Sequence, residues 1–458
     1  MSVATSAPDQ PEIATRAQPP EAPSGRKILP WIGPGLLWMI SAVGTGSVLF
    51  TPRVASQHRY ALLWVLLAVC LLMWVMIREA ARYTVVTGRS LLEGFARLPG
   101  PARWAVWVVL VPQVVAAVAG IAGLASIVGS ALETAVGGDH RLWAAGAIVA
   151  AAVLVVTDGY PLIEKAARYL AAVLTGITVV AAVRVGPSLG DLGAGLVPSL
   201  PDGIDPYVVG PWIGTILAGS MGIVWFSYWT AARGFGGRSP LAESPDTEDD
   251  EIEPLGEEDR HERIHAWMRL MSTTAAVGVV AGAIVLVAYM VLGAELLAPE
   301  GILPQGSDVA ADLSRLLQDV WGRTGFWLMI AAVLVALGGS VLANQDGWGR
   351  SFADMTIILR RGHGLPAWAT RRRLTELYVL TLTGVLPIVV VLLVSDPVAI
   401  MSASGLVAAL HTPLIVGLIV AVNRRDLPDE LGPGWVTTGL TGSSVVVYTV
   451  VGALQVIG

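Results

Sequence analysis

Long apolar segments recur along the whole sequence, and they constrain the fold more than any other feature. Each holds about 20 residues, enough to cross roughly 30 Å of hydrocarbon as a helix. Backbone polar groups inside a bilayer must be satisfied within their own segment, so these runs are predicted to be helices. Only 14% of the 458 residues are charged, whereas a soluble domain carries about 25%. The sequence therefore predicts an all-α membrane protein with about eleven transmembrane helices.

The predicted spans follow these runs, with boundary errors of several residues. They cover residues 32–55, 60–78, 104–132, 141–157, 167–185, 208–232, 268–294, 324–345, 375–394, 398–421 and 435–457. Residues 1–30 are polar and rich in Pro and Ala, so we expect a disordered cytoplasmic tail. Residues 31–458 then form a single transmembrane domain. The single cysteine, Cys70, excludes disulfides and a cysteine metal cluster.

Basic residues gather in alternate connections between the predicted spans, which places those connections on one side of the membrane. They are Arg26, Lys27, Arg78, Arg82, Arg89, Arg97, Arg103, Lys165, Arg168, Arg360, Arg361, Arg371, Arg372, Arg373, Arg424 and Arg425. This pattern predicts an inner-membrane protein with a cytoplasmic N-terminus and an extracytoplasmic C-terminus. The acidic connection 239–263 is then a cytoplasmic loop. We interpret it as a solvated linker; a divalent-ion sensor is the alternative.

Two glycine-rich clusters interrupt the first and sixth spans at matched positions. If spans one to five (about 31–186) and six to ten (about 208–422) are repeats, with 435–457 as an extra helix, the clusters correspond. Transporters bind their substrates where two helices are interrupted in this way. We predict unwound segments and a midplane site; close packing through small residues is the alternative. The predicted lining is Gly44, Thr45, Gly46, Ser47, Ser220, Met221, Gly222 and Ile223.

Short motifs between residues 30 and 425 match the spacing known from one transporter family. They are Gly33-Pro34-Gly35-Leu36-Leu37, Tyr60-Ala61-Leu62-Leu63-Trp64, Thr87-Gly88-Arg89-Ser90-Leu91-Leu92-Glu93, and the stretches 160–164, 372–387 and 404–413. In these motifs the chain resembles the NRAMP metal-ion transporters. The resemblance implies a LeuT-like fold of two inverted five-helix repeats plus one extra helix. It also implies secondary active transport by alternating access.

The residues that bind metal in that family are replaced here. Gly44 and Ser47 align with an Asp and an Asn of the first helix. Ile223-Val224-Trp225 stands where the family has a Met-Pro-His motif, whose sulfur selects soft metals. Gly405 stands in place of a glutamine of span ten. Ala117 and Gly120 stand in place of two third-helix carboxylates used for proton movement. The resemblance thus implies the scaffold but not the family's usual substrate.

The neutral lining favours a different ligand. Transition metals need soft or anionic ligands, and hard divalent ions usually need a carboxylate. The central parts of spans one, three and six contain no Asp, Glu, His or Cys. Glycine-exposed N–H groups, with the hydroxyls of Thr45 and Ser47, instead resemble an anion-binding nest. We therefore favour a small oxyanion such as bicarbonate, with Arg53 as its cationic partner; snorkelling of Arg53 to the outer interface is the alternative.

Other side chains are accessory candidates. Trp225 and Tyr228 follow the second cluster and form either a wall of the site or a packing contact. His411 follows Gly405 by more than one helical turn. It would carry a proton if it titrates, although a lone histidine in a helix usually has a packing role.

Two other functions stay open: transport of hydrated Mg²⁺ or Mn²⁺ through a carboxylate-free site, and a non-transporting membrane sensor. The sequence contains no phosphate loop, catalytic triad or zinc motif, so we expect no enzyme activity, no cofactor and no resident metal. The expected partners are a small inorganic ion and the lipid bilayer, without nucleic acid. The coupling ion, Na⁺ or H⁺, and the oligomeric state are undetermined, with a monomer as one possibility.

Overall fold

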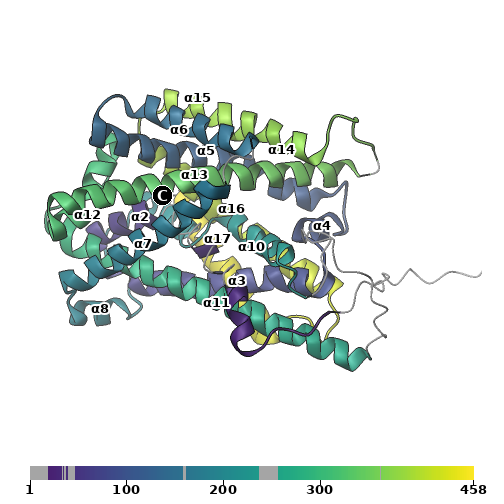
Figure 1. The fold of residues 1–458 in the computed structure, drawn as a ribbon. Helices are drawn as coiled ribbons and strands as arrows, with labels where there is room; N and C mark the ends of the chain where they lie inside the picture. The colour runs from purple at the N-terminus through teal and green to yellow at the C-terminus, as the bar shows by residue number, and fades with distance from the viewer. Residues whose placement is uncertain are drawn as a thin grey trace, which may run out of the picture.

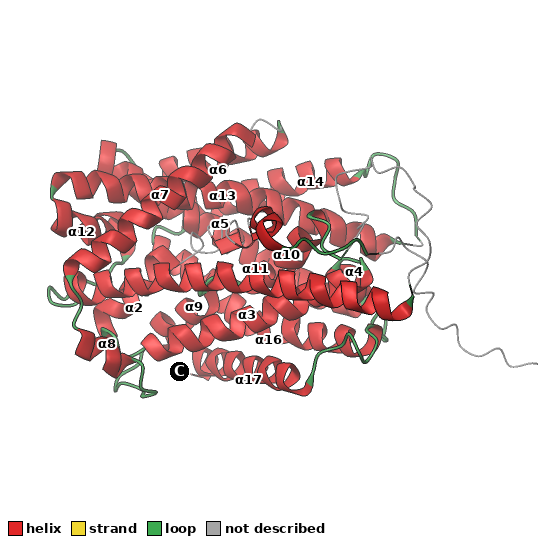
Figure 2. Ribbon diagram, turned by 60° about the horizontal axis from the view of Figure 1, so that its bottom comes forward, coloured by secondary structure: helices red, strands yellow, loops and turns green. Residues whose placement is uncertain are grey.

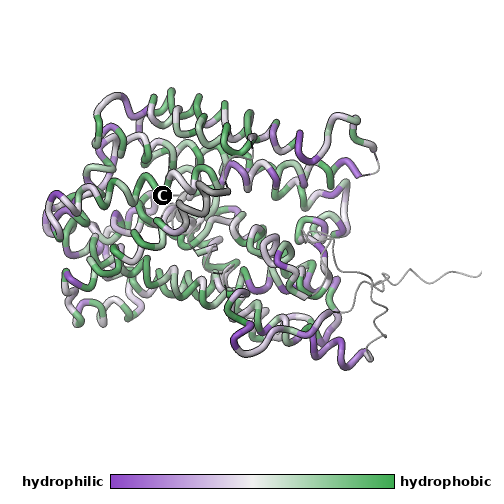
Figure 3. The backbone as a smooth tube through the Cα atoms, viewed as in Figure 1, coloured by the Kyte–Doolittle hydropathy of each residue, from purple (hydrophilic) through white to green (hydrophobic). Residues whose placement is uncertain are grey.

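The computed structural model describes residues 19–32, 35, 38–39, 47–157, 161–236, 256–361 and 363–457. The regular secondary structure of these residues is entirely helical (Figure 2), which confirms the predicted all-α class. The helices pack side by side in an elongated bundle (Figure 1). Apolar residues fill its middle, and polar residues lie mostly at its two ends (Figure 3). We call one end the α4 end, which the basic residues predict to be cytoplasmic, and the opposite end the α12 end.

The first half of the chain forms the helices that correspond to predicted spans one to five. After a short 3₁₀ helix at Gly25–Ile28, they are α2 (Ser47–His58), α3 (Leu63–Thr87), α4 (Leu91–Ala96), α5 (Trp104–Val136), α6 (His140–Val156), α7 (Pro161–Val185) and α8 (Leu189–Gly195). The short helix α4 begins with a capping box, in which Ser90 and Glu93 satisfy each other's backbone N–H groups. It turns the chain back into the bundle between α3 and α5.

The second half contains the helices of predicted spans six to eleven. They are α9 (Pro206–Thr215), α10 (Ser220–Ala232), α11 (Glu257–Leu292), η2 (Gly293–Leu297), η3 (Gly306–Asp308), α12 (Val309–Trp321), α13 (Arg323–Arg360), α14 (Arg371–Leu380), η4 (Thr381–Val385), α15 (Leu386–Leu393), α16 (Pro397–Asp426) and α17 (Trp435–Ile457). Helix α13 continues past residue 345, where the predicted apolar span ends. Asp346 is the first charged residue beyond that span, and it pairs with Arg350 one turn further along the helix.

Every predicted span coincides with helical residues, but the described residues define fewer complete crossings. Eight helices are long and apolar enough to span a membrane, or nine if the pair Tyr169–Val185 and α8, bent by 113°, is one span. Helix α6 is apolar but has only 17 residues, and α2 is the second half of span one. Residues 1–18 of the predicted tail and 239–255 of the acidic loop lie outside the described residues. Residues 257–263, predicted as loop, are the start of α11, whose acidic first turn suits the helix dipole.

Helices α9 and α16 cross at a contact made by two glycines. A Cβ atom on Gly214 would lie 2.2 Å from the carbonyl oxygen of Gly405, and one on Gly405 would lie 2.8 Å from the carbonyl oxygen of Pro211. Neither position has room for a side chain, so the two backbones approach closely. The contact fixes the first half of the sixth span against the tenth. Gly405 therefore has a packing role in this structure.

Substitution of Gly405 by Ala should therefore destabilise the protein. The added methyl group meets backbone atoms that cannot rotate away, and overpacking of this kind costs about 1–3 kcal/mol. Gly417 lies on the same helix with no atom within 4 Å of its Cβ position, so Gly417→Ala is a matched control. Thermal unfolding in detergent should show a lower midpoint for Gly405→Ala only. Equal midpoints for both variants would contradict the close contact.

Candidate functional site

The sixth span is interrupted between α9 and α10. Helix α9 ends at Thr215 and α10 begins at Ser220, so residues 216–219 are non-helical. The predicted interruption is confirmed, but it overlaps the glycine-rich cluster only at Gly219. Leu217 adopts a left-handed backbone conformation with φ of 63°, which is strained for a residue with a side chain. The unwinding therefore depends on more than the glycines that predicted it.

The side chain of Leu217 packs into a notch on α11. A Cβ atom on Gly282 would lie 2.3 Å from Cδ2 of Leu217, so a larger residue at 282 would require the Leu217 side chain to shift. Leu217 is fully buried, and this burial offsets its backbone strain, which is of the order of 1–3 kcal/mol. One turn earlier on α11, Gly278 makes a similar contact, because its Cβ would lie 2.5 Å from the carbonyl oxygen of Gly35 in span one. Helix α11 thus contacts both span one and span six.

The break exposes two helix ends of opposite polarity. The start of α10 has Gly219 as its N-cap and no side-chain cap, so the N–H groups of Ser220 and Met221 have no intrahelical acceptor. The end of α9 presents carbonyl oxygens and the negative end of its dipole. Ser220 and Met221 are 1% and 2% exposed. Buried backbone groups of this kind need a partner, which a bound ion or water would supply.

Three side chains from different spans meet at the start of α10. Gln113 on α5 donates from Nε2 to Ser220 Oγ at 2.7 Å, and the same nitrogen lies 2.5 Å from Nδ1 of His411 on α16. Nε2 of His411 lies 3.1 Å from the carbonyl oxygen of Val108. A carbonyl only accepts, so Nε2 carries the proton and Nδ1 accepts from Gln113. The cluster Gln113–Ser220–His411 is therefore neutral in this arrangement.

The cluster leaves one acceptor unused. Oε1 of Gln113 is buried and has no hydrogen-bond partner among the described residues, although Gln113 is only 1% exposed. An unpaired buried acceptor costs about 1–3 kcal/mol. It lies on the amide that contacts Ser220, so the site offers both free N–H donors and one free oxygen. The sequence interpretation missed Gln113, although a single amide in the otherwise apolar span three was the available signal.

Spans one and six are joined on both sides of the break in span six. Nε1 of Trp38, in span one, donates to the carbonyl oxygen of Gly222 at 3.2 Å. Nε1 of Trp212, on α9, donates to Oγ1 of Thr51 on α2 at 3.1 Å. Spans one and six therefore pack together, as a site between them requires. Gly44, Thr45 and Gly46 lie outside the described residues; Ser47 is the first residue of α2, and its side chain is also outside them.

The remaining candidates lie away from the cluster. Arg53 on α2 has Asp205 and Asp396, the N-cap residues of α9 and α16, as its electrostatic partners. On α10, Nε1 of Trp225 donates to Oγ of Ser351 at 2.9 Å, and the Tyr228 side chain hydrogen-bonds to Ser90. These contacts join α10 to α13 and to the start of α4. They fit the packing alternative for the two aromatic residues.

The chemistry of the described site is polar and uncharged. Among the residues that the structure describes, no group of three or more His, Cys, Asp or Glu side chains could hold a metal ion. Because α10 begins at Ser220, Met221 rather than Ile223 lies in the turn next to the break. The arrangement offers N–H donors, carbonyl oxygens and one thioether, without an anionic ligand.

Comparisons with known proteins place this fold. A crystal structure of a mutant manganese transporter from Eremococcus coleocola superposes with a TM-score of 0.70 at 14% identity, covering 95% of this chain and 88% of that one. Mhp1, a nucleobase-cation-symport-1 family transporter, gives 0.53 at 12% identity, covering 92% and 90%. MhsT in complex with L-phenylalanine gives 0.51 at 15% identity, covering 96% and 99%. The bundle therefore has the LeuT-like fold that was predicted.

Sequence comparison adds the family. The metal transporter Nramp6.2 of Populus trichocarpa is 33% identical over 87 residues, which are 19% of this chain and 16% of that protein. The chain thus matches only a small part of this curated relative. The sequence model of the family described as natural resistance-associated macrophage protein-like matches residues 35–458. This multi-pass membrane protein belongs to the Nramp family.

Proposed function

We propose that the chain is a secondary active transporter that moves a small oxyanion, with bicarbonate as the leading candidate, by alternating access. It lies in the inner membrane with its α4 end in the cytoplasm. Family membership supports transport rather than catalysis, and the similar solved structures are of transporters. The observation that carries the anion proposal is the buried, uncapped start of α10 beside the neutral Gln113–Ser220–His411 cluster.

Bicarbonate matches the hydrogen-bonding groups at this site. Its charged oxygens accept from the N–H groups of Ser220 and Met221, where the helix dipole favours negative charge. Its single hydroxyl donates to Oε1 of Gln113, the acceptor that has no partner among the described residues. Hydrogen bonds to a charged group contribute about 1.5–3 kcal/mol each. Several of them offset a desolvation penalty of several kcal/mol.

Transport of a divalent cation is the second candidate. It is favoured by the family, by the carbonyl oxygens at the end of α9 and by the unpaired Oε1 of Gln113. The relatives named above include a metal transporter and a manganese transporter. Mg²⁺ retains several waters when few carboxylates are available, so a hydrated ion is the form that a site without carboxylates would accept. The thioether of Met221 would suit a softer ion.

Uptake by proteoliposomes separates these candidates. Radiolabelled bicarbonate uptake should be saturable and exceed that of empty liposomes, while Mn²⁺ outside should not quench a metal-sensitive dye inside. Saturable quenching without bicarbonate uptake would overturn the anion proposal in favour of the cation. Absence of both fluxes, in protein shown to be folded, would leave the sensor as the better account.

A charge at the start of α10 gives a sharper test. Ser220→Asp places a carboxylate where the anion would lie, and repulsion should lower bicarbonate uptake by at least about tenfold, equivalent to about 1.4 kcal/mol. Ser220→Asn is the matched control, because it has the same shape without the charge. Uptake by the Asn variant should clearly exceed that of the Asp variant. Equal losses would indicate a steric effect, and Mn²⁺ uptake gained by the Asp variant alone would support a cation path.

A further inference from the structure

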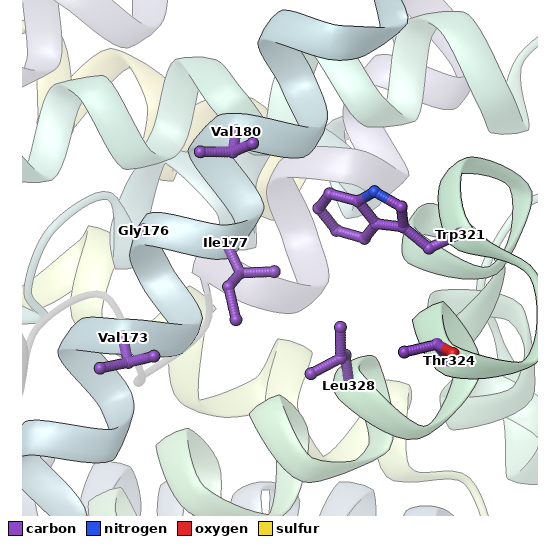
Figure 4. Close-up of a pocket in the computed structure, with 7 residues that line it drawn as sticks. All are labelled: Val173, Gly176, Ile177, Val180, Trp321, Thr324 and Leu328. Atoms are coloured by element: carbon purple, nitrogen blue, oxygen red, sulfur yellow. The ribbon is translucent and has the colours of Figure 1, made fainter.

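A cavity lies between α7 and the turn that joins α12 to α13 (Figure 4). Its volume is about 640 Å³, and apolar side chains supply most of its lining. Gly176 widens it, because a Cβ atom there would have no neighbour within 4 Å. The lining residues are Val173, Gly176, Ile177, Val180, Trp321, Thr324 and Leu328.

This cavity, called the α7–α13 groove below, opens toward the surrounding membrane. Val173 and Val180 line it and are each 58% exposed. Both lie within α7, and α7 is apolar enough to form a membrane span together with α8. Trp327, on the neighbouring surface of α13, is also exposed. A groove with these exposed apolar walls draws its occupant from the bilayer.

Two hydrogen-bond donors lie on the α12–α13 side of the groove. The Trp321 indole extends toward α7, and Thr324 lies near Leu328 on the same side (Figure 4). Within the described residues, neither Nε1 of Trp321 nor Oγ1 of Thr324 has a protein partner. The other lining side chains are apolar. The groove is therefore amphipathic, with two donors on its α12–α13 side and only apolar side chains along α7.

Two arginines lie close in sequence to the two walls of the groove. Arg184 lies one turn beyond Val180 on the same face of α7, about 6 Å along the helix axis, and Arg323 directly precedes Thr324. Both arginines are exposed. Neither forms an ion pair with another residue that the structure describes. The arginines, the two donors and the apolar lining match the three parts of a phospholipid, which are its phosphate, its ester linkages and its acyl chains.

We propose that the α7–α13 groove binds an anionic phospholipid of the surrounding membrane. One acyl chain lies between α7 and α13 along Val180, Ile177 and Val173. The ester carbonyls accept from Trp321 and Thr324, and the phosphate lies between Arg184 and Arg323. Because α7 belongs to the first repeat and α13 to the second, the bound lipid joins the two repeats at the α12 end.

Native mass spectrometry of the purified full chain tests this proposal with phosphatidylglycerol and phosphatidylcholine of identical acyl chains. The protein should retain phosphatidylglycerol about tenfold more than phosphatidylcholine, a difference of about 1.4 kcal/mol. The double variant Arg184→Ala/Arg323→Ala should lose this preference. Equal retention of the two lipids by the unchanged protein would overturn the proposal.

A filling variant tests the groove itself. Gly176→Phe should occupy the space of the acyl chain and reduce retention of both lipids. Gly146→Phe is the matched control, because Gly146 is also an exposed glycine of an apolar helix with nothing within 4 Å of its Cβ position. Undiminished phosphatidylglycerol binding by Gly176→Phe would contradict the assignment.

The unchanged protein supplies a measurement that does not depend on the folding of any variant. Its thermal unfolding midpoint should be higher in nanodiscs of phosphatidylglycerol than in those of phosphatidylcholine, since a ligand that binds only the folded state stabilises it. Equal midpoints would overturn the proposal.

Discussion

The unpaired backbone groups at the break between α9 and α10 are the constraint on which the rest of the structure depends. A helix can stop inside a membrane protein only where other groups satisfy its last N–H and C=O groups. Here the start of α10 has no side-chain cap, while Gln113 and His411 approach Ser220 from two other helices. The surrounding bundle therefore has to hold polar groups at its centre and still exclude lipid from them.

Close helix contacts provide that enclosure. Glycines at 214 and 405 let α9 and α16 approach at backbone distance, and Gly278 does the same for α11 against span one. Gly282 instead makes room for the Leu217 side chain. Hydrophobic burial gives little preference between helix partners in a bilayer, because lipid is as apolar as the side chains. Small residues and a few buried hydrogen bonds, such as that from Trp212 to Thr51, therefore determine which helices meet.

Much of the fold could be predicted from the sequence, because apolar length and the basic connections carry strong physical signals. The helix positions and the interruption of span six are confirmed. Helix α13 continues beyond the predicted apolar span, because charged residues such as Asp346 and Arg350 pair with each other along the helix. Gln113 was missed, since its partners come from α10 and α16, which are distant in sequence. The roles of Gly44 to Ser47 and of Arg53 stay predictions.

The contact between Leu217 and Gly282 has a mechanical consequence. The side chain of Leu217 packs against Gly282 on α11, and this contact holds its left-handed backbone. Leu217 lies between α9 and α10, so a rotation of one helix relative to the other would either break this contact or move α11 as well. Since Gly278 on α11 also abuts Gly35, such a movement reaches span one through the same helix. Spans one and six thus share α11 as a common support, in addition to their own hydrogen bonds.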